Sequence, residues 1–188
     1  MKTKRVVSYL LLIIGLFIFG NKLINKRDKT IIENNKIAYT IEKEVNYNYK
    51  DIDYYNMILV IPKINLKKGI YEKDDSRNDI SKNIMIHNKS DYPDIENGNV
   101  ILIAHSGSGY LAFFKDLDKL DNDSLIELYY KHTKYIYKLD NHYDIDKTGI
   151  ASITRDNNKK TITLITCSNK DKNKQVIYIG YLIDEVKY

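Results

Sequence analysis

The sequence of 188 residues contains one cysteine, two prolines and no tryptophan. A single cysteine, Cys167, excludes an intrachain disulfide and any metal site built from several cysteines. Lysine and aspartate are interleaved along the chain rather than gathered into a basic stripe, although the formal net charge is +5. This charge distribution argues against a surface that binds nucleic acid, so no nucleic-acid partner is expected.

No internal repeat or low-complexity tract interrupts the sequence. Hydrophobic residues make up 43% and charged residues 29% of the chain, close to the averages for globular proteins. Once the apolar N-terminal stretch is set aside, the remaining length suits one domain of roughly 130 to 150 residues. The composition therefore predicts one globular domain with a real hydrophobic core.

Residues 6–20 form an uncharged, mostly aliphatic run that follows three basic residues. Polar residues next to the run can reach the membrane interface, so the span can extend to residue 24 and approach the roughly 20 residues that cross a bilayer. The preceding positive charges predict a cytoplasmic N-terminus and an exported remainder. A cleaved secretory signal is the alternative, but no small-x-small cleavage site follows Phe19. We predict an uncleaved transmembrane signal anchor over residues 1–24, which would place the protein in the cell membrane.

Residues 25–56 are rich in Lys, Glu, Asp and Asn and contain no Pro or Gly, which predicts a polar stalk that is helical in part. From residue 57 to residue 188, short runs rich in Val, Ile, Thr and Tyr alternate with polar turns, a pattern typical of β-strands. These runs are 57–61, 84–86, 100–104, 125–130, 135–139, 161–166 and 176–183. They predict a mainly β domain arranged as a closed or nearly closed barrel. Apolar residues at intervals of three in residues 111–120 predict a short amphipathic helix or a helical turn.

Cys167 ends the run Thr-Ile-Thr-Leu-Ile-Thr-Cys and is followed by a polar loop. A side chain at a strand end can reach solvent while the strand holds its position. A free thiol has a pKa of about 8.5 and needs a polarising neighbour such as histidine to become a good nucleophile. The alternative interpretation is a buried cysteine that packs as a small hydrophobe.

Four histidines could serve as that neighbour. His105 follows a buried apolar run and opens the loop Ser-Gly-Ser-Gly-Tyr, so it also lies where a strand gives way to a flexible segment. His87 has a weaker version of this setting. His132 and His142 lie among charged and polar residues, which is typical of solvated surface positions. The residues alone thus suggest Cys167 and His105 as a candidate catalytic pair.

Four segments together resemble the pattern of the sortase family. They are Ile-Leu-Val-Ile-Pro-Lys-Ile-Asn-Leu from residue 58, Gly-Asn-Val-Ile-Leu-Ile-Ala-His-Ser-Gly from residue 98, Phe-Phe-Lys-Asp-Leu from residue 113 and Thr-Leu-Ile-Thr-Cys from residue 163. The resemblance covers residue 57 to the C-terminus. It implies a mainly β fold, the sortase-type closed β-barrel with short helices, here preceded by a transmembrane helix and a polar stalk.

The resemblance also implies a reaction. Sortases are cysteine transpeptidases that cleave a C-terminal sorting motif of the Leu-Pro-x-Thr-Gly type in surface proteins. Cys167 would form the thioester, and His105 would transfer the proton. An amino group of a cell-wall precursor or of another protein would accept the acyl group, outside the cell. No metal ion or organic cofactor is implied.

One position departs from the family pattern. Sortases carry an arginine at the start of the strand after the cysteine loop, and counting back from Gly180 this position falls on Gln175, with Lys174 adjacent. No arginine follows Arg155, which we expect to be structural or solvated. The amide of Gln175 can donate hydrogen bonds to an oxyanion but supplies no charge, so Gln175 is a candidate catalytic residue. Two alternatives remain, a binding module that captures sorting motifs without turnover and a hydrolytic cysteine peptidase.

Overall fold

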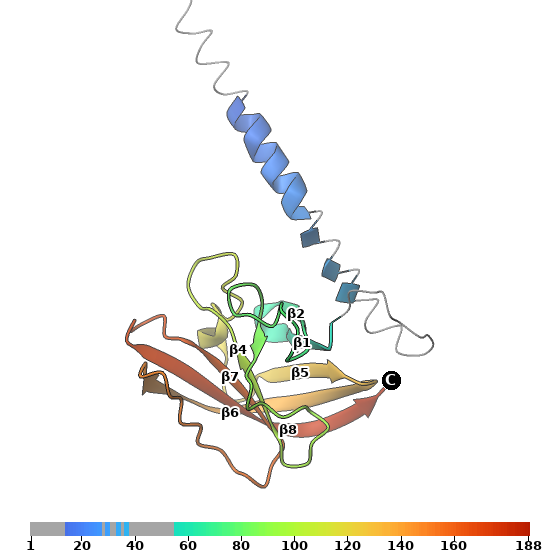
Figure 1. Ribbon diagram of the computed structural model, residues 1–188, viewed down its shortest axis with the longest axis vertical. Helices are drawn as coiled ribbons and strands as arrows, with labels where there is room; N and C mark the ends of the chain where they lie inside the picture. The colour runs from blue at the N-terminus through green and yellow to red at the C-terminus, as the bar shows by residue number, and fades with distance from the viewer. Residues whose placement is uncertain (1–13, 28, 31–32, 35, 38–54) are drawn as a thin grey trace, which may run out of the picture.

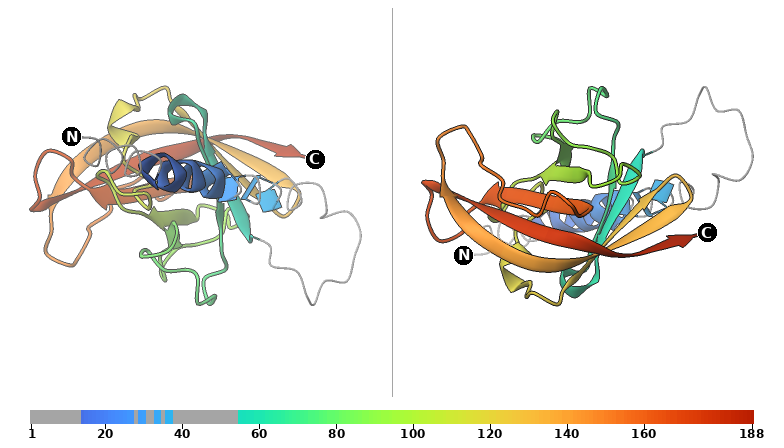
Figure 2. Two further views of the ribbon diagram at one scale, coloured as in Figure 1. Left: turned by 90° about the horizontal axis from the view of Figure 1, so that it is seen from above. Right: turned by 90° about the horizontal axis from the view of Figure 1, so that it is seen from below.

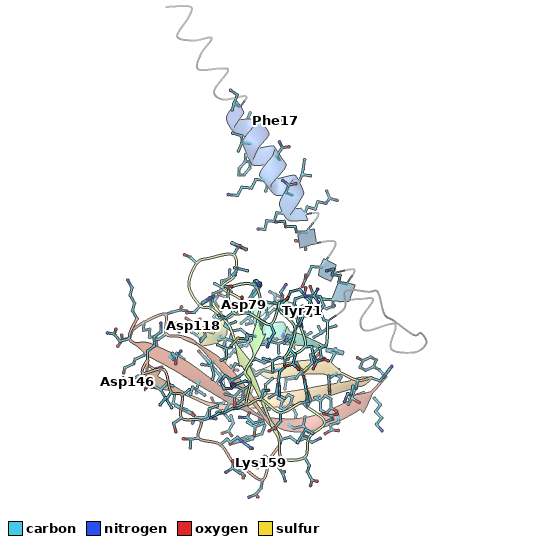
Figure 3. The ribbon with its side chains drawn as sticks, in the orientation of Figure 1. Phe17, Tyr71, Asp79, Asp118, Asp146 and Lys159 are labelled. Atoms are coloured by element: carbon cyan, nitrogen blue, oxygen red, sulfur yellow. The ribbon has the colours of Figure 1, made fainter. Side chains whose placement is uncertain are left out.

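The computed structural model describes residues 14–27, 29–30, 33–34, 36–37 and 55–188 (Figure 1). Residues 14–27 are helical, and Phe17 projects from this helix (Figure 3). Among the described residues, no helix has the length and hydropathy needed to cross a membrane. The predicted anchor begins at residue 1 and its apolar run at residue 6, and residues 1–13 lie outside the described part, so the anchor stays a prediction.

Residues 55–188 form an eight-stranded sheet with two short 3-10 helices. The strands are β1 (Met57–Ile61), β2 (Leu66–Ile70), β3 (Met85–Ile86), β4 (Asn99–Ile103), β5 (Leu125–Tyr130), β6 (Thr133–Asp146), β7 (Thr161–Cys167) and β8 (Lys174–Lys187). The 3-10 helices are η1 (Pro62–Ile64) and η2 (Leu117–Lys119). The predicted mainly β domain is confirmed, and η2 is the helical turn within the predicted segment 111–120.

The strand order is β2-β1-β5-β6-β8-β7-β4-β3, and all pairs are antiparallel except β4 with β7. The two edge strands, β2 and β3, are not paired with each other in this order, so the predicted closed barrel is corrected to a nearly closed one. The buried Asn83 bridges the seam, since its Nδ2 donates to the carbonyl oxygen of Gly69 at 2.9 Å. β3 contains two residues and is too short to complete a ladder along this edge.

The long strands β6 and β8 run side by side and curve across the molecule (Figure 2). Their register shifts twice, between Ile136 and Tyr137 and between Leu139 and Asn141. Such β-bulges bend a strand and increase its twist. Because one extra residue reverses the alternation of side chains, odd-numbered residues of β6 face the barrel interior before the second bulge and the outer face after it. β6 and β8 are both longer than the runs predicted for them, 135–139 and 176–183.

The core has a large interior cluster and a smaller cluster on the outer face of β4, β7 and β8. Alternate residues of β7 contribute to the two clusters, with Leu164 in the interior cluster and Ile165 in the outer one. A strand buried on both faces reads as a continuous apolar run, which is why residues 161–166 stand out in the sequence. The outer cluster consists of Ile101, Ile165, Ile177 and Ile179, against which Ile103, Tyr143, Ile145, Ile153 and Tyr181 pack.

Part of the predicted stalk docks on the barrel. Ile37 is fully buried and packs with Tyr55 and Ile58. The carboxylate of Glu33 accepts hydrogen bonds from Tyr55 Oη at 2.6 Å and from Lys68 Nζ at 2.8 Å. Burial, and then the neighbouring Glu33 carboxylate, raise the pKa of Tyr55. The phenol therefore stays protonated at neutral pH and acts as the donor of this hydrogen bond.

Gly69 makes this docking possible, because the ring of Tyr55 lies directly against it. A Cβ added at residue 69 would meet Tyr55 Cδ2 at 2.0 Å. We expect Gly69→Ala to displace Tyr55 and to lower the free energy of unfolding by about 1 to 3 kcal/mol, the usual cost of overpacking. Denaturant unfolding measures the change. Gly109→Ala is the matched control, since an added Cβ there meets no atom within 4 Å. Equal stability of the two variants would contradict this account of the docking.

Candidate active site

Cys167 is the last residue of β7, where the strand gives way to the loop before β8. It is a free, half-buried thiol. Side chains alternate along a strand, so Cys167 points to the same outer face as Ile165. Because β7 pairs on both edges, with β4 and with β8, the position of the thiol is held from two sides.

His105 is brought to the same end of the sheet by the parallel pairing of β4 with β7. Ile103 pairs with Ile165 as the last pair of this register, and His105 and Cys167 each follow two residues later on their own strand. Neighbouring strands lie about 4.8 Å apart, so the paired β4 and β7 lead both residues to the same end of the sheet. The pairing persists beyond β4, since the amide of Ala104 donates to the carbonyl oxygen of Ile165 at 3.2 Å. The His105 side chain is exposed, as a group that meets a substrate must be.

The backbone around His105 is anchored on both sides. Thr166 Oγ1 donates to the carbonyl oxygen of Ala104 at 2.9 Å, and this hydrogen bond is buried. The amide of Phe114 donates to the carbonyl oxygen of His105 at 3.0 Å and folds the glycine-containing loop back onto the strand end. This loop thus begins and ends on fixed backbone, which limits how far His105 can move from Cys167.

Gln175 lies opposite Cys167 on the other edge of β7, since the two residues pair in the antiparallel register of β7 and β8. Its side chain is half-buried and shares the outer face with the thiol. Lys174 pairs instead with Asp146 of β6, and its carbonyl oxygen accepts a hydrogen bond from the amide of Ser168 at 3.0 Å. Cys167 and Gln175 are therefore paired across β7 and β8, and His105 follows β4, the strand on the other edge of β7.

Two other histidines, His87 and His132, lie elsewhere. His87 follows β3, and its amide bonds to the carbonyl oxygen of Ile101, about 13 Å along β4 from His105 at 3.3 Å per residue. Burial, followed by the charges of Lys89 and Lys73, lowers the pKa of His87 and favours its neutral form. His132 has a positive φ of 55° in the turn between β5 and β6.

Arg155, which we expected to be structural or solvated, has a structural role. Its Nη1 donates to the carbonyl oxygen of Lys159 at 3.2 Å and to Thr161 Oγ1 at 3.3 Å. These bonds fold the end of the connection between β6 and β7 onto the first residue of β7. Arg155 therefore sits at the end of β7 opposite to Cys167 and contributes no charge to the thiol.

Lys147 is a residue of the site that the sequence did not reveal. It follows the last residue of β6, and its Nζ lies 3.8 Å from Cys167 Sγ. The amide of Lys147 donates to the carbonyl oxygen of Asn173 at 2.8 Å, which ties the end of β6 to the loop before β8. The predicted run 135–139 stopped before the second bulge, so Lys147 appeared as one lysine among many in a polar connection.

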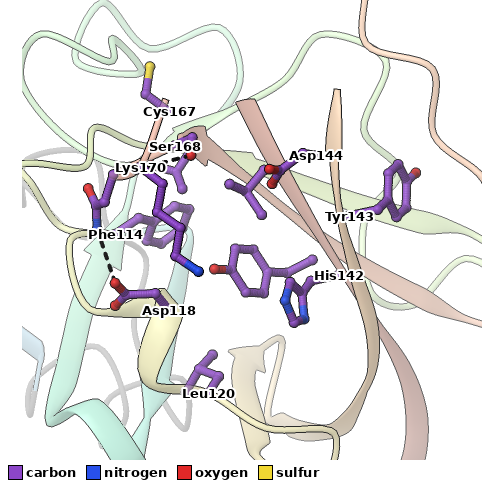
Figure 4. A pocket seen from close by; sticks show the side chains of 13 residues that line it. Phe114, Asp118, Leu120, His142, Tyr143, Asp144, Cys167, Ser168 and Lys170 are labelled. Atoms are coloured by element: carbon purple, nitrogen blue, oxygen red, sulfur yellow. Dashed lines mark hydrogen bonds between the residues drawn. The ribbon is translucent and has the colours of Figure 1, made fainter. Parts of the chain in front are cut away.

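A cavity of about 400 Å³ lies on the interior side of the same strand ends. The sulfur of Cys167 points away from the other side chains that line it (Figure 4). His142 stacks on Tyr178 at this cavity, with ring centroids 5.3 Å apart. Burial, then the charges of Asp118 and Asp144, raise the pKa of Tyr178 to about 12. The thiol therefore points to the outer face of the sheet, which also carries half-buried Ile103 and Ile145.

No group of three or more His, Cys, Asp or Glu side chains suited to a metal ion occurs in the described part of the chain. The candidate site consists of the Cys167 thiol at the end of β7 and the His105 imidazole beyond the end of β4, together with the Gln175 amide and the Lys147 ammonium group. These groups provide a nucleophile, a proton carrier and two donors for a developing negative charge, which is the set that acyl transfer requires.

A family model described as the sortase domain matches residues 59–183. The chain belongs to the sortase family. Among curated relatives, sortase D of Bacillus subtilis (strain 168) is 30% identical over 110 residues, which cover 58% of this chain and 52% of that protein. Sortase A of Bacillus anthracis is 32% identical over 94 residues, which cover 46% and 41% of the two chains. The chain thus spans about half the length of the curated relatives it matches.

Solved sortase structures share the fold. The sortase D5 transpeptidase of Clostridium perfringens superposes with a TM-score of 0.63 at 21% identity, covering 81% of this chain and 99% of that one. Sortase A of Corynebacterium diphtheriae, solved as a lid mutant, gives a TM-score of 0.62 at 19% identity, with 72% and 73% coverage. The nearly closed barrel described above is therefore the sortase fold.

The buried hydrogen bond from Thr166 to Ala104 predicts a specific defect. Thr166→Val removes the donor next to both Cys167 and His105, so we expect a loss of about 1 to 3 kcal/mol in the free energy of unfolding. We also expect thioester formation with a sorting-motif peptide to slow by up to about 100-fold, because small displacements of reacting groups have effects of that size.

Thr163→Val is the matched control for Thr166→Val. Thr163 Oγ1 makes an equally buried hydrogen bond, 2.8 Å from Asn99 Oδ1, across the same two strands but far from their active ends. We expect this variant to lose comparable stability, measured by denaturant unfolding, and to form the thioester at the normal rate. Equal rates in the two variants would show that Thr166 does not position the site.

Proposed function

We propose that the chain is a membrane-anchored sortase transpeptidase that cleaves a C-terminal sorting motif of the Leu-Pro-x-Thr-Gly type in surface proteins. The observation that carries this proposal is the parallel pairing of β4 with β7, which brings the segments that end in His105 and Cys167 to the same end of the sheet. The family match over residues 59–183 and the likeness to the Clostridium perfringens sortase, itself a transpeptidase, support the same reaction.

The first half-reaction acylates the enzyme. The Cys167 thiolate forms a bond to the scissile carbonyl carbon, and the carbonyl π electrons move to the oxygen. As this oxyanion collapses, the carbon–nitrogen bond breaks and the leaving amine takes a proton from His105. Gln175, opposite Cys167, is positioned to donate its side-chain amide to the oxyanion or to a peptide carbonyl.

The second half-reaction releases the product. An amino group of a cell-wall precursor or of another protein attacks the thioester carbon, and His105 accepts its proton. The carbon–sulfur bond then breaks and the Cys167 thiolate is regenerated, so atoms and protons balance over one cycle. The half-buried Ile103 and Ile145 on the outer face, the face toward which the thiol points, suit the leucine and proline of such a motif.

Substitution of the candidate pair tests the mechanism. We expect Cys167→Ala to abolish both the thioester and the transfer product with the fold intact, because no other thiol exists in the chain. His105→Ala should reduce the rate about 100- to 10,000-fold, the range for a positioned acid or base. His87→Ala is the control, since His87 lies elsewhere along β4. Mass spectrometry of the protein with a library of sorting-motif peptides and amine acceptors measures both steps. Transfer by Cys167→Ala, or a defect in His87→Ala but not in His105→Ala, would refute the assignment.

The same experiment separates two further functions. A binding module is favoured by the uncharged Gln175 at the position opposite Cys167, and it would bind the peptides without forming any thioester. A hydrolytic cysteine peptidase would form the thioester but release cleaved acid even when an amine acceptor is abundant. A transpeptidase shifts its product from acid to amide as the amine concentration rises.

The membrane anchor is part of this proposal. The described part of the N-terminal helix exposes large apolar side chains, among them Phe17 at 69% and Leu16 at 63%. We expect the whole protein to fractionate with membranes at full length, with its C-terminal domain open to added protease in cells stripped of wall. Recovery of a soluble form that begins after Phe19 would show a cleaved signal instead.

A further inference from the structure

Gln175 of β8 pairs with Cys167, and His105 follows β4 on the other edge of β7. Neither carries a permanent positive charge, since glutamine is neutral and histidine must give up its proton during the reaction. A permanent positive charge beside the sulfur therefore has to come from a residue other than His105 and Gln175. Lys147 is the charged residue that the structure places against the sulfur, with Nζ 3.8 Å from Cys167 Sγ.

The position of Lys147 follows from the fold. Ile145 pairs with Gln175, so Ile145 shares the outer face with Cys167, and Lys147 lies two residues further along on that face. The second bulge of β6 sets this orientation, because without the extra residue the side chain would point to the interior face. The amide bond from Lys147 to Asn173 fixes the backbone at 2.8 Å. The ammonium group thus reaches the thiol from a backbone that is hydrogen-bonded in place.

The charge of Lys147 is not neutralised by a neighbouring carboxylate. Several other lysines of the described chain form ion pairs, such as Lys160 with Glu185 at 2.6 Å, but no ion pair of Lys147 occurs within residues 55–188. Its side chain is exposed. An unpaired cation within 4 Å of a sulfur favours negative charge on that sulfur and on atoms bonded next to it.

We propose that Lys147 supplies the positive charge at the reaction centre, first beside the Cys167 thiolate and then beside the oxyanion that forms on the attacked carbonyl. This inference rests on the proposed transpeptidase function for its second half. During acylation the negative charge moves from sulfur to the carbonyl oxygen, two bonds away, and the ammonium group follows it without gaining or losing a proton. In this arrangement Gln175 is a neutral hydrogen-bond donor, and Lys147, which directly follows β6, supplies the positive charge.

Alkylation with two reagents tests the charge without any substrate. Iodoacetate is an anion and iodoacetamide is neutral, and both react with the thiolate of the single cysteine, so the ratio of their rates reports the local charge and not the amount of thiolate. We expect Lys147→Gln to lower the ratio of iodoacetate to iodoacetamide rates about fivefold, the effect of one unit charge at about 4 Å in water. Lys147→Arg should keep the ratio.

Lys170→Gln is the matched control, because it removes one lysine charge close to Cys167 in the sequence but not beside the sulfur. Lys170 lies in the loop directly after Cys167, yet its side chain extends away from the sulfur and into the cavity (Figure 4). We expect this variant to leave the ratio of alkylation rates unchanged. An unchanged ratio in Lys147→Gln, or an equal fall in Lys147→Gln and Lys170→Gln, would overturn the assignment of the charge to Lys147.

Thioester formation by the full chain with a sorting-motif peptide tests whether Lys147 also stabilises the oxyanion. We expect Lys147→Gln to slow acylation about 100- to 1,000-fold, as the loss of an oxyanion donor does, and Lys147→Arg to recover most of the rate. A normal acylation rate in Lys147→Gln would overturn the catalytic role. If the unmodified protein forms no thioester with any peptide, the transpeptidase proposal fails, while the alkylation ratio still decides whether Lys147 holds its charge at the thiol.

Discussion

The parallel pairing of β4 with β7 is the constraint on which the site depends. It joins segments that lie far apart in the sequence, and it is the one parallel pair in a sheet of otherwise antiparallel neighbours within the described chain. Both strands are buried on their two faces, so a slip of one residue would move apolar side chains into the wrong layer. The hydrophobic packing that fixes this register therefore also brings the segments that end in His105 and Cys167 to the same end of the sheet.

The second bulge of β6 has an equally specific effect. It turns Tyr143 and Ile145 toward the outer face, where they pack with Ile177 beside the thiol. It also directs Lys147 to that face. A single unpaired residue in one strand thus determines which side chains surround the nucleophile, which agrees with the tendency of bulges to occur next to active sites.

Charge in this site is arranged differently from the family pattern that the sequence led us to expect. Counting back from Gly180 assigns the family's arginine position to Gln175, which pairs with Cys167, and the Nζ of Lys147, directly after β6, lies 3.8 Å from the sulfur. An amide and an ammonium group held by two strands can together provide the hydrogen bond and the charge that one guanidinium provides alone. The two functions are then separable by substitution, which a single arginine would not allow.

The mainly β class, most of the strands and the candidates Cys167, His105 and Gln175 could be predicted from the amino-acid sequence, because strand periodicity and a resemblance to sortases are local properties of the chain. The sequence did not reveal β2, whose run Leu-Lys-Lys-Gly-Ile lacks a clear alternation, nor the full length of β6, whose bulge breaks the period of two. The open seam between β2 and β3 and the approach of Lys147 to the thiol became visible only in three dimensions. Both depend on which distant strands pair and in what register, and that is set by the packing of the whole core rather than by neighbouring residues.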